Sequence, residues 1–237
     1  MSTPIVIVGP GRLGRSAAQI LKQNGQKYVL VGRNQIIPQA PITWLTVPDR
    51  ETEDASNAVP QGGVVLHASG ARDRGPLHAH ENSGSLHPLM TFPGPEFGLP
   101  IEPTIPAAVA GNSKAISAAR TLADLLGFTP FEVSGNRALY HAAAVTSGNF
   151  ASLLLIEAGK MLRAAGVTEA EAGPLLMPLA IASIRSAATH GRSALTGPIA
   201  RGDEAVIQTH TEALTALDPA IADLYQALAD ATRRLKP

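Results

Sequence analysis

Short apolar runs, rich in β-branched residues and bounded by Gly, Pro or Asn, recur through the first half of the chain. Such runs are typical of strands that lie buried in a parallel sheet. They predict strands at 5–8, 28–31, 42–47, 64–68, 84–86, 107–110 and 131–133. Helical patterns occupy 15–24 and 113–126, and a glycine that can end a helix follows each of them.

The pattern changes after residue 135. Helical patterns of small and apolar residues cover 137–165 and 168–190, and no strand pattern follows them. Asp203 can cap a helix that ends near residue 217, and Asp218 with Pro219 can begin a last helix that ends near 235. We therefore expect two domains, an α/β domain at 1–135 and an all-helical domain at 136–237.

Two stretches have more than one interpretation. The segment 142–162 is apolar around most of its circumference, so a helix there needs burial on several sides, either within the monomer or in the core of a dimer. Prolines are dense at 88–106, which predicts an ordered, irregular loop across the carboxyl ends of the strands, with a linker as the alternative.

A glycine-rich motif, Gly9-Pro10-Gly11-Arg12-Leu13-Gly14, directly follows the first predicted strand. Between a strand and a helix, this pattern indicates dinucleotide binding: the first glycine allows a tight turn, the second lets backbone approach a pyrophosphate, and the third lets helix and strand pack closely. The helix N-terminus then faces the anion. A glycine-rich turn without a ligand is the alternative, but the context favours a cofactor. The predicted fold class is α/β, a Rossmann-like doubly wound parallel sheet followed by an all-α C-terminal domain.

The end of the second predicted strand bears on the choice of cofactor. Arg33 and Asn34 stand where an acidic residue would hold the ribose hydroxyls of NAD, and an arginine can bind a 2′-phosphate instead. This favours NADP, with a solvated surface arginine as the alternative. Too few residues separate Asn34 from Ile42 for the usual helix and third strand, so we expect a sheet shortened on its adenosine side and an open or incomplete adenine pocket.

Two further loops at strand ends belong to the expected cofactor site. Val47-Pro48-Asp49 is placed to touch the nicotinamide half, and Ser69-Gly70 follows the strand at 64–68. Open α/β sheets bind ligands at the carboxyl ends of their strands. Simple turns explain both sequences equally well.

The candidate catalytic residues are His87, His141 and Asn149. His87 stands at a strand end immediately before a proline, and a histidine satisfied by backbone hydrogen bonds would have the same pattern. His141, Val145 and Asn149 share one face of the predicted helix at i, i+4 and i+8. Polar groups on a mostly apolar helical face are costly unless they are paired or used. The neighbouring Tyr140 is a candidate for substrate binding.

The loop at 195–203 offers two more candidates for substrate binding, Thr196 and Arg201. Arg201 can meet an anionic substrate group, or it can simply pair with Asp203. His78 and His80 are interpreted as loop histidines, and no metal site is expected, because no second cluster has metal-ligand spacing.

The composition narrows the possible partners. The 19 basic and 19 acidic residues of the 237-residue chain cancel, which favours a small-molecule partner over nucleic acid or an acidic membrane. The absence of cysteine excludes disulfides, thiolate metal sites and thiol nucleophiles. The N-terminus lacks a signal-peptide pattern and the apolar stretches are interrupted, so we expect a soluble, cytoplasmic protein.

With these residues in hand, the chain resembles a two-domain bacterial family in which an NADP-binding Rossmann-like domain precedes a helical domain of unknown function. The resemblance spans nearly the whole chain and rests on the glycine motif, on 47–49 and, more specifically, on 85–89, 137–144 and 195–203. The family is related to the 6-phosphogluconate dehydrogenase-like superfamily, in which pyrroline-5-carboxylate reductase, prephenate dehydrogenase and deazaflavin-dependent NADP reductase have similar architectures. The resemblance implies a reductase fold, often dimeric through the helical domain, and no particular substrate.

The chain departs from the superfamily in one catalytic feature. Hydroxyacid dehydrogenases of the superfamily carry a lysine and an asparagine four residues apart on the first long helix, whereas Val145 follows His141 at that spacing here. A β-hydroxyacid oxidation by that route is therefore not expected.

These patterns together predict an NADP-dependent oxidoreductase that transfers a hydride between nicotinamide and a small carbonyl or imine substrate held between the two domains. His141 is the expected acid or base, because the pKa of a histidine lies near neutrality. Asn149 is expected to orient the substrate, and His87 and Arg201 to bind its polar end. A homodimer through the helical domain is expected. The alternatives are a non-catalytic NADP-binding sensor and a structural dimer that has lost cofactor binding.

Overall fold

The computed structural model describes residues 5–99 and 104–235 and divides into two units. The first unit ends at Gly148 and the second begins at Asn149. The sequence pattern predicts a boundary at 135, where strands give way to helices. The structure places it later, because helix α4, Arg137–Val145, holds two side chains of its first turn against the first unit.

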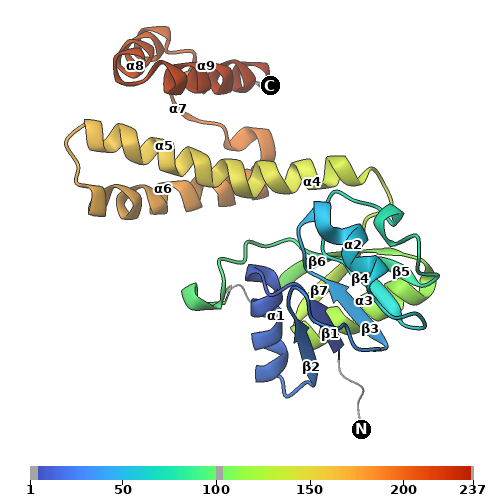
Figure 1. The fold of residues 1–237 in the computed structure, drawn as a ribbon. Coiled ribbons are helices and arrows are strands. Elements are labelled where there is room, and N and C mark those ends of the chain that lie inside the picture. Colours follow the sequence, from blue (N-terminus) through green and yellow to red (C-terminus); the bar gives the residue numbers. More distant parts are fainter. Residues whose placement is uncertain (1–4, 100–103, 236–237) are drawn as a thin grey trace. The chain divides into compact units, whose positions relative to one another are not determined.

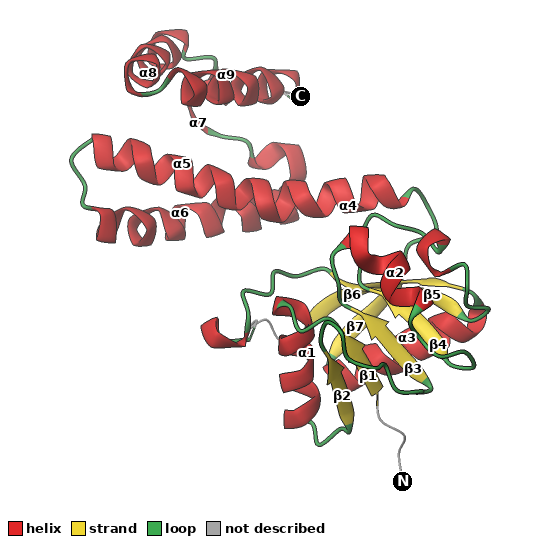
Figure 2. Ribbon diagram, viewed as in Figure 1, coloured by secondary structure: helices red, strands yellow, loops and turns green. Residues whose placement is uncertain are grey.

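The first unit contains a seven-stranded sheet (Figures 1 and 2). Its spatial order is β2-β1-β3-β4-β5-β6-β7, and every neighbouring pair is parallel except the antiparallel pair of β5 and β6. The strands are β1 Ile5–Val8, β2 Tyr28–Val31, β3 Ile42–Leu45, β4 Val64–His67, β5 Ser83–Pro88, β6 Ile105–Gly111 and β7 Phe128–Glu132. The doubly wound Rossmann-like sheet predicted from the sequence is confirmed, with this one antiparallel pair as an addition.

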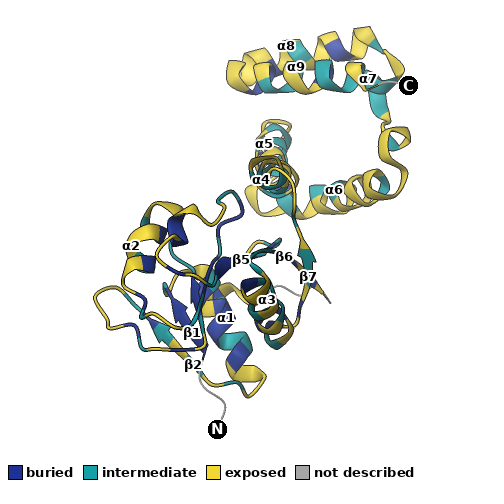
Figure 3. Cartoon of the chain, turned by 90° about the vertical axis from the view of Figure 1, so that its right-hand side faces the viewer, coloured by how far each residue is buried: buried dark blue, intermediate teal, exposed yellow. Residues whose placement is uncertain are grey.

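Strand β1 is buried on both faces, as its unbroken apolar run predicts (Figure 3). Successive side chains of a strand point to opposite faces. Ile5 and Ile7 belong to a core cluster with α1, Arg12–Gln23, and α3, Ser113–Leu126, whereas Val6 and Val8 belong to a second cluster that α2, Thr52–Asn57, adjoins through Ala55. The two clusters hold the carboxyl end of β1 in place between β2 and β3.

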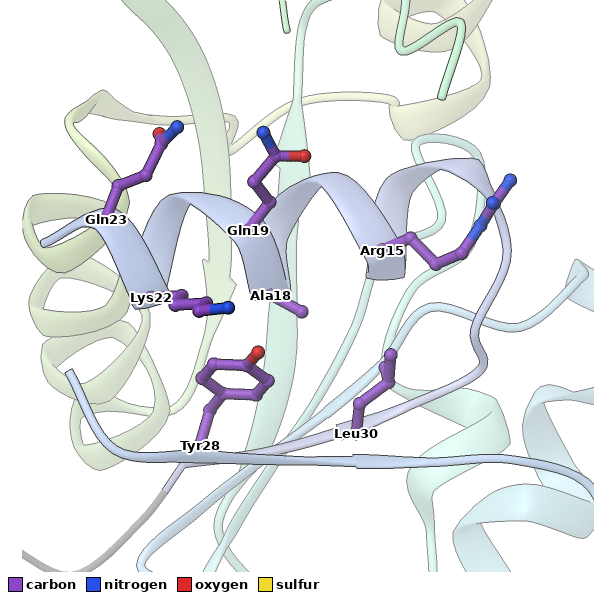
Figure 4. A pocket seen from close by; sticks show the side chains of 7 residues that line it. All are labelled: Arg15, Ala18, Gln19, Lys22, Gln23, Tyr28 and Leu30. Atoms are coloured by element: carbon purple, nitrogen blue, oxygen red, sulfur yellow. The ribbon is translucent and has the colours of Figure 1, made fainter. Parts of the chain in front are cut away.

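The short connection after β2 shortens the sheet, as expected. Residues 32–41 form neither helix nor strand, and β2 is an edge strand. A surface hollow of about 630 Å³ lies along α1 and β2 (Figure 4), lined by Arg15, Ala18, Gln19, Lys22, Gln23, Tyr28 and Leu30. Ile37 and Ala40 nevertheless pack into the second core cluster, so the connection itself is anchored.

The predicted element bounds agree with the structure to within about three residues, and the difference at β7 has a local cause. Strand β7 begins at Phe128, three residues before the predicted start, and includes Pro130. A proline removes one ladder donor, which an edge strand tolerates. Helix α3 begins and ends as predicted, with the Asn112 side chain accepting from the Ala115 amide and Gly127 in the left-handed conformation.

The second unit is all-helical, as predicted. Figure 2 shows it entirely as helices and loops. Its helices are α5 Ala151–Ala164, α6 Glu169–His190, α7 Gly197–Arg201, α8 Glu204–Leu217 and α9 Pro219–Arg234, with a 3₁₀ turn at Gly191–Ala194. Asp218 caps α9 by accepting from the Ala220 amide, and Pro219 occupies the first turn. Helices α5 and α6 pack against each other. Helices α8 and α9 also pack against each other, and they contribute the small buried cluster of Leu214, Ile221 and Ala222.

Candidate functional site

The glycine turn joins β1 to α1 as the motif predicts. Gly9 has φ +108°, and a side chain there would lie 2.9 Å from the Thr46 carbonyl oxygen. A Cβ at Gly14 would lie 2.6 Å from Thr46 Oγ1 and still closer to the Gly9 carbonyl oxygen. A Cβ at Gly11 would meet nothing closer than 4.0 Å, and the φ of Gly11 is −72°. The fold therefore requires glycine at 9 and 14, but the residues around Gly11 do not.

Thr46, just after β3, ties the turn to the next strand. Its hydroxyl lies 2.8 Å from the Gly9 carbonyl and 3.0 Å from the Val8 carbonyl, and its amide donates to Val8. These contacts hold the turn in a fixed position at the carboxyl edge of the sheet. Sequence reasoning did not select Thr46, because a threonine after a strand has no distinctive pattern.

A cavity of about 850 Å³ opens beside this turn. Of the predicted cofactor residues, Gly9, Pro10, Arg33, Asn34, Val47 and Pro48 line it. Ile37, Ala55 and Ala58 supply apolar lining from the connection after β2 and from the segment at α2. Residues of α2 and of the anchored connection thus line one side of this cavity, and the expectation of an open or incomplete adenine pocket stays a prediction.

Charged side chains at this cavity form a small network. Glu51 lies 3.5 Å from an Arg33 nitrogen and 3.8 Å from Nε of Arg50. Both arginines are strongly exposed, so neither ion pair is strong in water. A phosphate could compete with Glu51 for them. Arg50 is a cavity residue that sequence reasoning missed, because it lies in a short 3₁₀ turn with no motif.

A second cluster lies at the ends of β4 and β5 and at the start of α4. Ser69 Oγ donates to Asp49 Oδ2 at 2.9 Å, and one nitrogen of Arg137, Nη2, donates to the Ser69 carbonyl at 2.9 Å. His87 Nδ1 and the Tyr140 hydroxyl are hydrogen-bonded at 2.7 Å. Residues predicted as separate candidates, from a 3₁₀ turn, a loop, a strand and a helix, thus lie in one cluster.

Gly70 lies directly against two imidazole rings. A Cβ there would lie 2.6 Å from Cδ2 of His141 and 2.9 Å from Nε2 of His87. The two rings meet edge to face with their centroids 6.0 Å apart. The structure therefore brings together His87, His141, Tyr140, Ser69 and Gly70, and the missing side chain at Gly70 makes room for both histidines.

Burial fixes the charge of the innermost histidines. It lowers the pKa of His87 to about 4, with His141 and Arg137 adding a smaller effect of the same sign. Burial also lowers the pKa of His67, whose Nε2 bonds the Asp73 carbonyl and whose Nδ1 accepts from the Ser69 amide. Both rings are neutral at pH 7. The pKa of the Tyr140 hydroxyl is raised by burial, so the phenol keeps its proton.

Sequence reasoning missed His67 and Arg137 as members of this cluster. His67 ends an apolar strand, where a buried histidine looks like any other strand residue. Arg137 begins α4, which Asn136 caps by accepting from the Ala138 and Leu139 amides. This cap starts the helix at the position that sets Arg137, Tyr140 and His141 beside the strand ends.

The remaining candidates have different surroundings. Asn149 lies in a π-helical turn, Thr146–Phe150, so the regular i, i+4, i+8 spacing from His141 is interrupted. Arg201 pairs with Asp203 at 2.9 Å, the alternative considered from the sequence, and Thr196 precedes α7 as its N-cap residue. His80 is buried, with Nε2 bonded to the Ser56 carbonyl. The described residues contain no group of three metal-ligating side chains.

The fold and the glycine turn define a class of protein. Of the solved structures, a Bacteroides fragilis protein named a "putative NADP oxidoreductase" matches with a TM-score of 0.84 and 21% identity, over 98% of each chain. A Thermotoga maritima protein matches with a TM-score of 0.74 and 21% identity, over 98% of this chain and 97% of its own. A reductive aminase from Aspergillus terreus in complex with NADPH and ethyl levulinate matches with a TM-score of 0.70 and 16% identity, over 99% of this chain and 94% of its own. The chain has the Rossmann-like fold of these solved structures.

The particular family follows from the second half of the chain. Residues 105–232 match the family described as a domain of unknown function, DUF2520. The match covers more than half of the 237 residues, and the chain belongs to this family. A comparison with curated proteins found no match.

Proposed function

We propose that this protein is an NADP-dependent oxidoreductase that reduces a small carbonyl or imine compound, or runs the reverse reaction. One observation carries the cofactor assignment: Gly11 is a glycine that the surrounding protein does not require, in a turn beside a cavity of about 850 Å³. A pyrophosphate can approach the backbone closely only where no side chain occupies this space. The Aspergillus relative determined with NADPH supports the same assignment.

The residues proposed to hold NADP are those of the turn and of the cavity: Gly9, Pro10, Gly11, Arg12, Leu13, Gly14, Arg33, Asn34, Val47, Pro48, Asp49, Ser69 and Gly70. The amides at the start of α1 suit the pyrophosphate, because a helix N-terminus favours an anion. Arg33, joined by Arg50, suits a 2′-phosphate, since a guanidinium can donate two parallel hydrogen bonds. Glu51 would then lose its two ion pairs to the incoming phosphate.

His141 is proposed as the acid that protonates the substrate. NADPH, when bound, supplies the hydride that reduces a carbonyl or imine carbon. The proton for the oxygen or nitrogen comes from the His141 ring, which takes it back from water. His87 stays neutral and orients its neighbours: with the Tyr140 hydroxyl as donor to Nδ1, its remaining proton is on Nε2, beside Gly70. Asn149, Thr196 and Arg201 remain predicted substrate contacts from the second unit.

Calorimetric titration with NADPH and NADH tests the cofactor assignment. We expect NADPH to bind more tightly than NADH, and Arg33→Ala to weaken NADPH binding by at least tenfold with little effect on NADH. Arg120→Ala is the control, because Arg120 is a half-exposed arginine whose partner, Glu132, is remote from the cavity lining. Absence of binding by folded protein would refute the assignment and leave a structural dimer.

A screen of carbonyl and imine compounds with NADPH tests the reaction. His141→Gln should lower kcat by at least a hundredfold and leave the Kd of NADPH unchanged, because the loss of general acid catalysis typically costs this much. Unchanged turnover would remove His141 from the mechanism. NADPH binding without turnover of any compound would favour the sensor.

We also propose that two copies associate through the helical unit. The helical stretch Arg137–Ala164 is long and apolar enough to cross a membrane, with a mean hydropathy of 1.3, and none of its most apolar window is buried inside the structure. Ile156, Leu175 and Leu179 are more than half exposed. A membrane span would have to bury the ion pair of Glu157 with Lys160. A second copy covers the apolar faces without that cost, and fits a cytoplasmic protein.

A further inference from the structure

Arg137 is the charged residue of the cluster whose bonding is least complete. Its Nη2 donates to the Ser69 carbonyl at 2.9 Å, and its guanidinium carbon lies 5.6 Å from the centre of the Tyr140 ring. Its Nε and Nη1 are buried, and neither has a partner among the described residues. A buried N–H of a charged group without a partner destabilises the folded protein. The structure therefore leaves two strong donors unused.

The charge of Arg137 is also unbalanced. No ion pair between described residues includes it, and Asp73 acts on it only from beyond ion-pair distance. Burial lowers the pKa of the Arg137 guanidinium, so the folded protein holds this charge at a cost. The neighbouring His67 and His87 are neutral, and Arg72 faces Asp49 at 4.0 Å. An anion is the group that this place lacks.

The position of Arg137 links it to the proposed chemistry. It bonds the carbonyl of Ser69, and the next residue, Gly70, touches the rings of His87 and His141. Arg137 therefore contacts the residue that precedes the glycine beside the proposed acid, His141, which lies one helical turn after Arg137 on α4. A single guanidinium with two unused donors matches the charge and acceptors of one carboxylate, whereas a phosphate monoester carries nearly two charges.

We propose that Arg137 binds a carboxylate of the substrate, so that the enzyme acts on small oxo acids or on the imines formed from them. This inference rests on the proposed oxidoreductase function and specifies its substrate class. It also assigns to Arg137 the anion-binding role that the sequence suggests for Arg201, which here has Asp203 as its partner.

Matched acids and esters test the proposal. NADPH-loaded protein is titrated by calorimetry with levulinate and ethyl levulinate, and with pyruvate and methyl pyruvate, so that each pair shares a ketone and differs in the carboxylate. We expect each acid to bind at least tenfold more tightly than its ester. In Arg137→Gln the acid should bind no better than the ester, and the affinity for the ester should be unchanged. Arg120→Gln, which removes an arginine paired with Glu132, should keep the preference.

A second readout separates anion binding from a purely structural role. The positive charge of Arg137 contributes to the low pKa of His87, along with His141 and His67, while Asp49 opposes it. A bound carboxylate offsets that charge, so levulinate should raise the pKa of His87 from about 4, followed by NMR of the ring, and ethyl levulinate should not. Arg137→Lys keeps the charge if Arg137→Gln does not fold.

Equal affinity for acid and ester, no binding of either acid, or an acid preference that survives in Arg137→Gln would overturn the proposal. These outcomes are distinct from failure of the proposed function. Turnover of ketone esters but not acids would support the oxidoreductase and refute the role of Arg137. Loss of NADPH binding would refute the cofactor assignment, and titration of the cofactor-free protein with the two acids would still decide whether Arg137 binds a carboxylate.

Discussion

Replacing two glycines of the same turn should separate cofactor binding from folding. Gly11→Ala adds a methyl group at a position where no atom lies closer than 4.0 Å, with φ −72° and ψ −171°, which alanine adopts without strain. Alanine is a poorer N-cap than glycine, but it also restricts the unfolded chain, and these effects oppose each other. We expect the free energy of unfolding to change by less than about 1 kcal/mol. NADPH affinity should fall at least tenfold, because the methyl group occupies the space proposed for the pyrophosphate.

Gly14→Ala should have the opposite profile. Its Cβ would lie 2.6 Å from Thr46 Oγ1 and closer still to the Gly9 carbonyl oxygen, so α1 must move away from β1. Helix α1 contributes Ala17, Ala18 and Leu21 to the first core cluster, and a shift disturbs all three. Overpacking of this kind costs about 1–3 kcal/mol, and a contact with backbone belongs at the upper end. A loss of about 3 kcal/mol is a large part of the 5–15 kcal/mol that is typical of a folded protein.

Urea unfolding followed by circular dichroism gives the stability of both variants, and calorimetry gives their affinity for NADPH. The reasoning predicts a stable Gly11→Ala that binds poorly and a destabilised Gly14→Ala. If Gly11→Ala binds NADPH like the unchanged protein, the turn is not the pyrophosphate site. If Gly14→Ala is as stable as the unchanged protein, the close helix–strand contact does not constrain the fold.

Three further predictions concern the histidine cluster and the helical unit. Gly70→Ala should displace the rings of His87 and His141 and lower turnover at least tenfold, whereas Gly135→Ala, where a Cβ meets no atom within 4 Å, should not. Because burial holds the pKa of His87 at about 4, the unfolded chain, with a pKa of about 6.5, binds this proton first; stability should fall as the pH drops from 6.5 to 4, by at most about 3 kcal/mol. Urea unfolding at pH 7 and 4.5 should show a smaller loss for His87→Gln, and an equal loss would contradict the burial argument. Leu179→Glu should shift the protein towards monomer in light scattering after gel filtration, since Leu179 is 66% exposed on α6; an unchanged mass would count against this helix as the interface.

The backbone could be predicted well because its signals are local. The strand at 5–8, the turn at Gly9 to Gly14 and the capped helix at 113–126 each carry their own pattern of burial, turn and cap residues. The all-helical second half follows in the same way from small residues and from the cap at Asp218. Strand β7 begins earlier than predicted because it lies at the edge of the sheet, where Pro130 is tolerated within a strand.

The candidate site was predictable one residue at a time but not as a network. Gly70 and His87 stand at strand ends, so the sequence marks each as a candidate. Their contact with each other depends on the order of β4 and β5 in the sheet and on where α4 returns. Nothing in the sequence indicates that Arg137 is buried, because an arginine at the start of a helix is usually exposed. Its two unpartnered donors are buried because α4 places the side chain against Ser69, with the Tyr140 ring one turn further along the same helix.

The sequence alone therefore determined the fold class, the glycine turn and the short connection after β2, because hydrophobic periodicity, φ preferences and segment length are properties of neighbouring residues. The tertiary structure decided which polar groups are buried together, which histidines are neutral, and that residues of α2 and Ile37 line a cavity beside the glycine turn. Those properties depend on burial and on distances between residues far apart in the chain, and no local pattern encodes them.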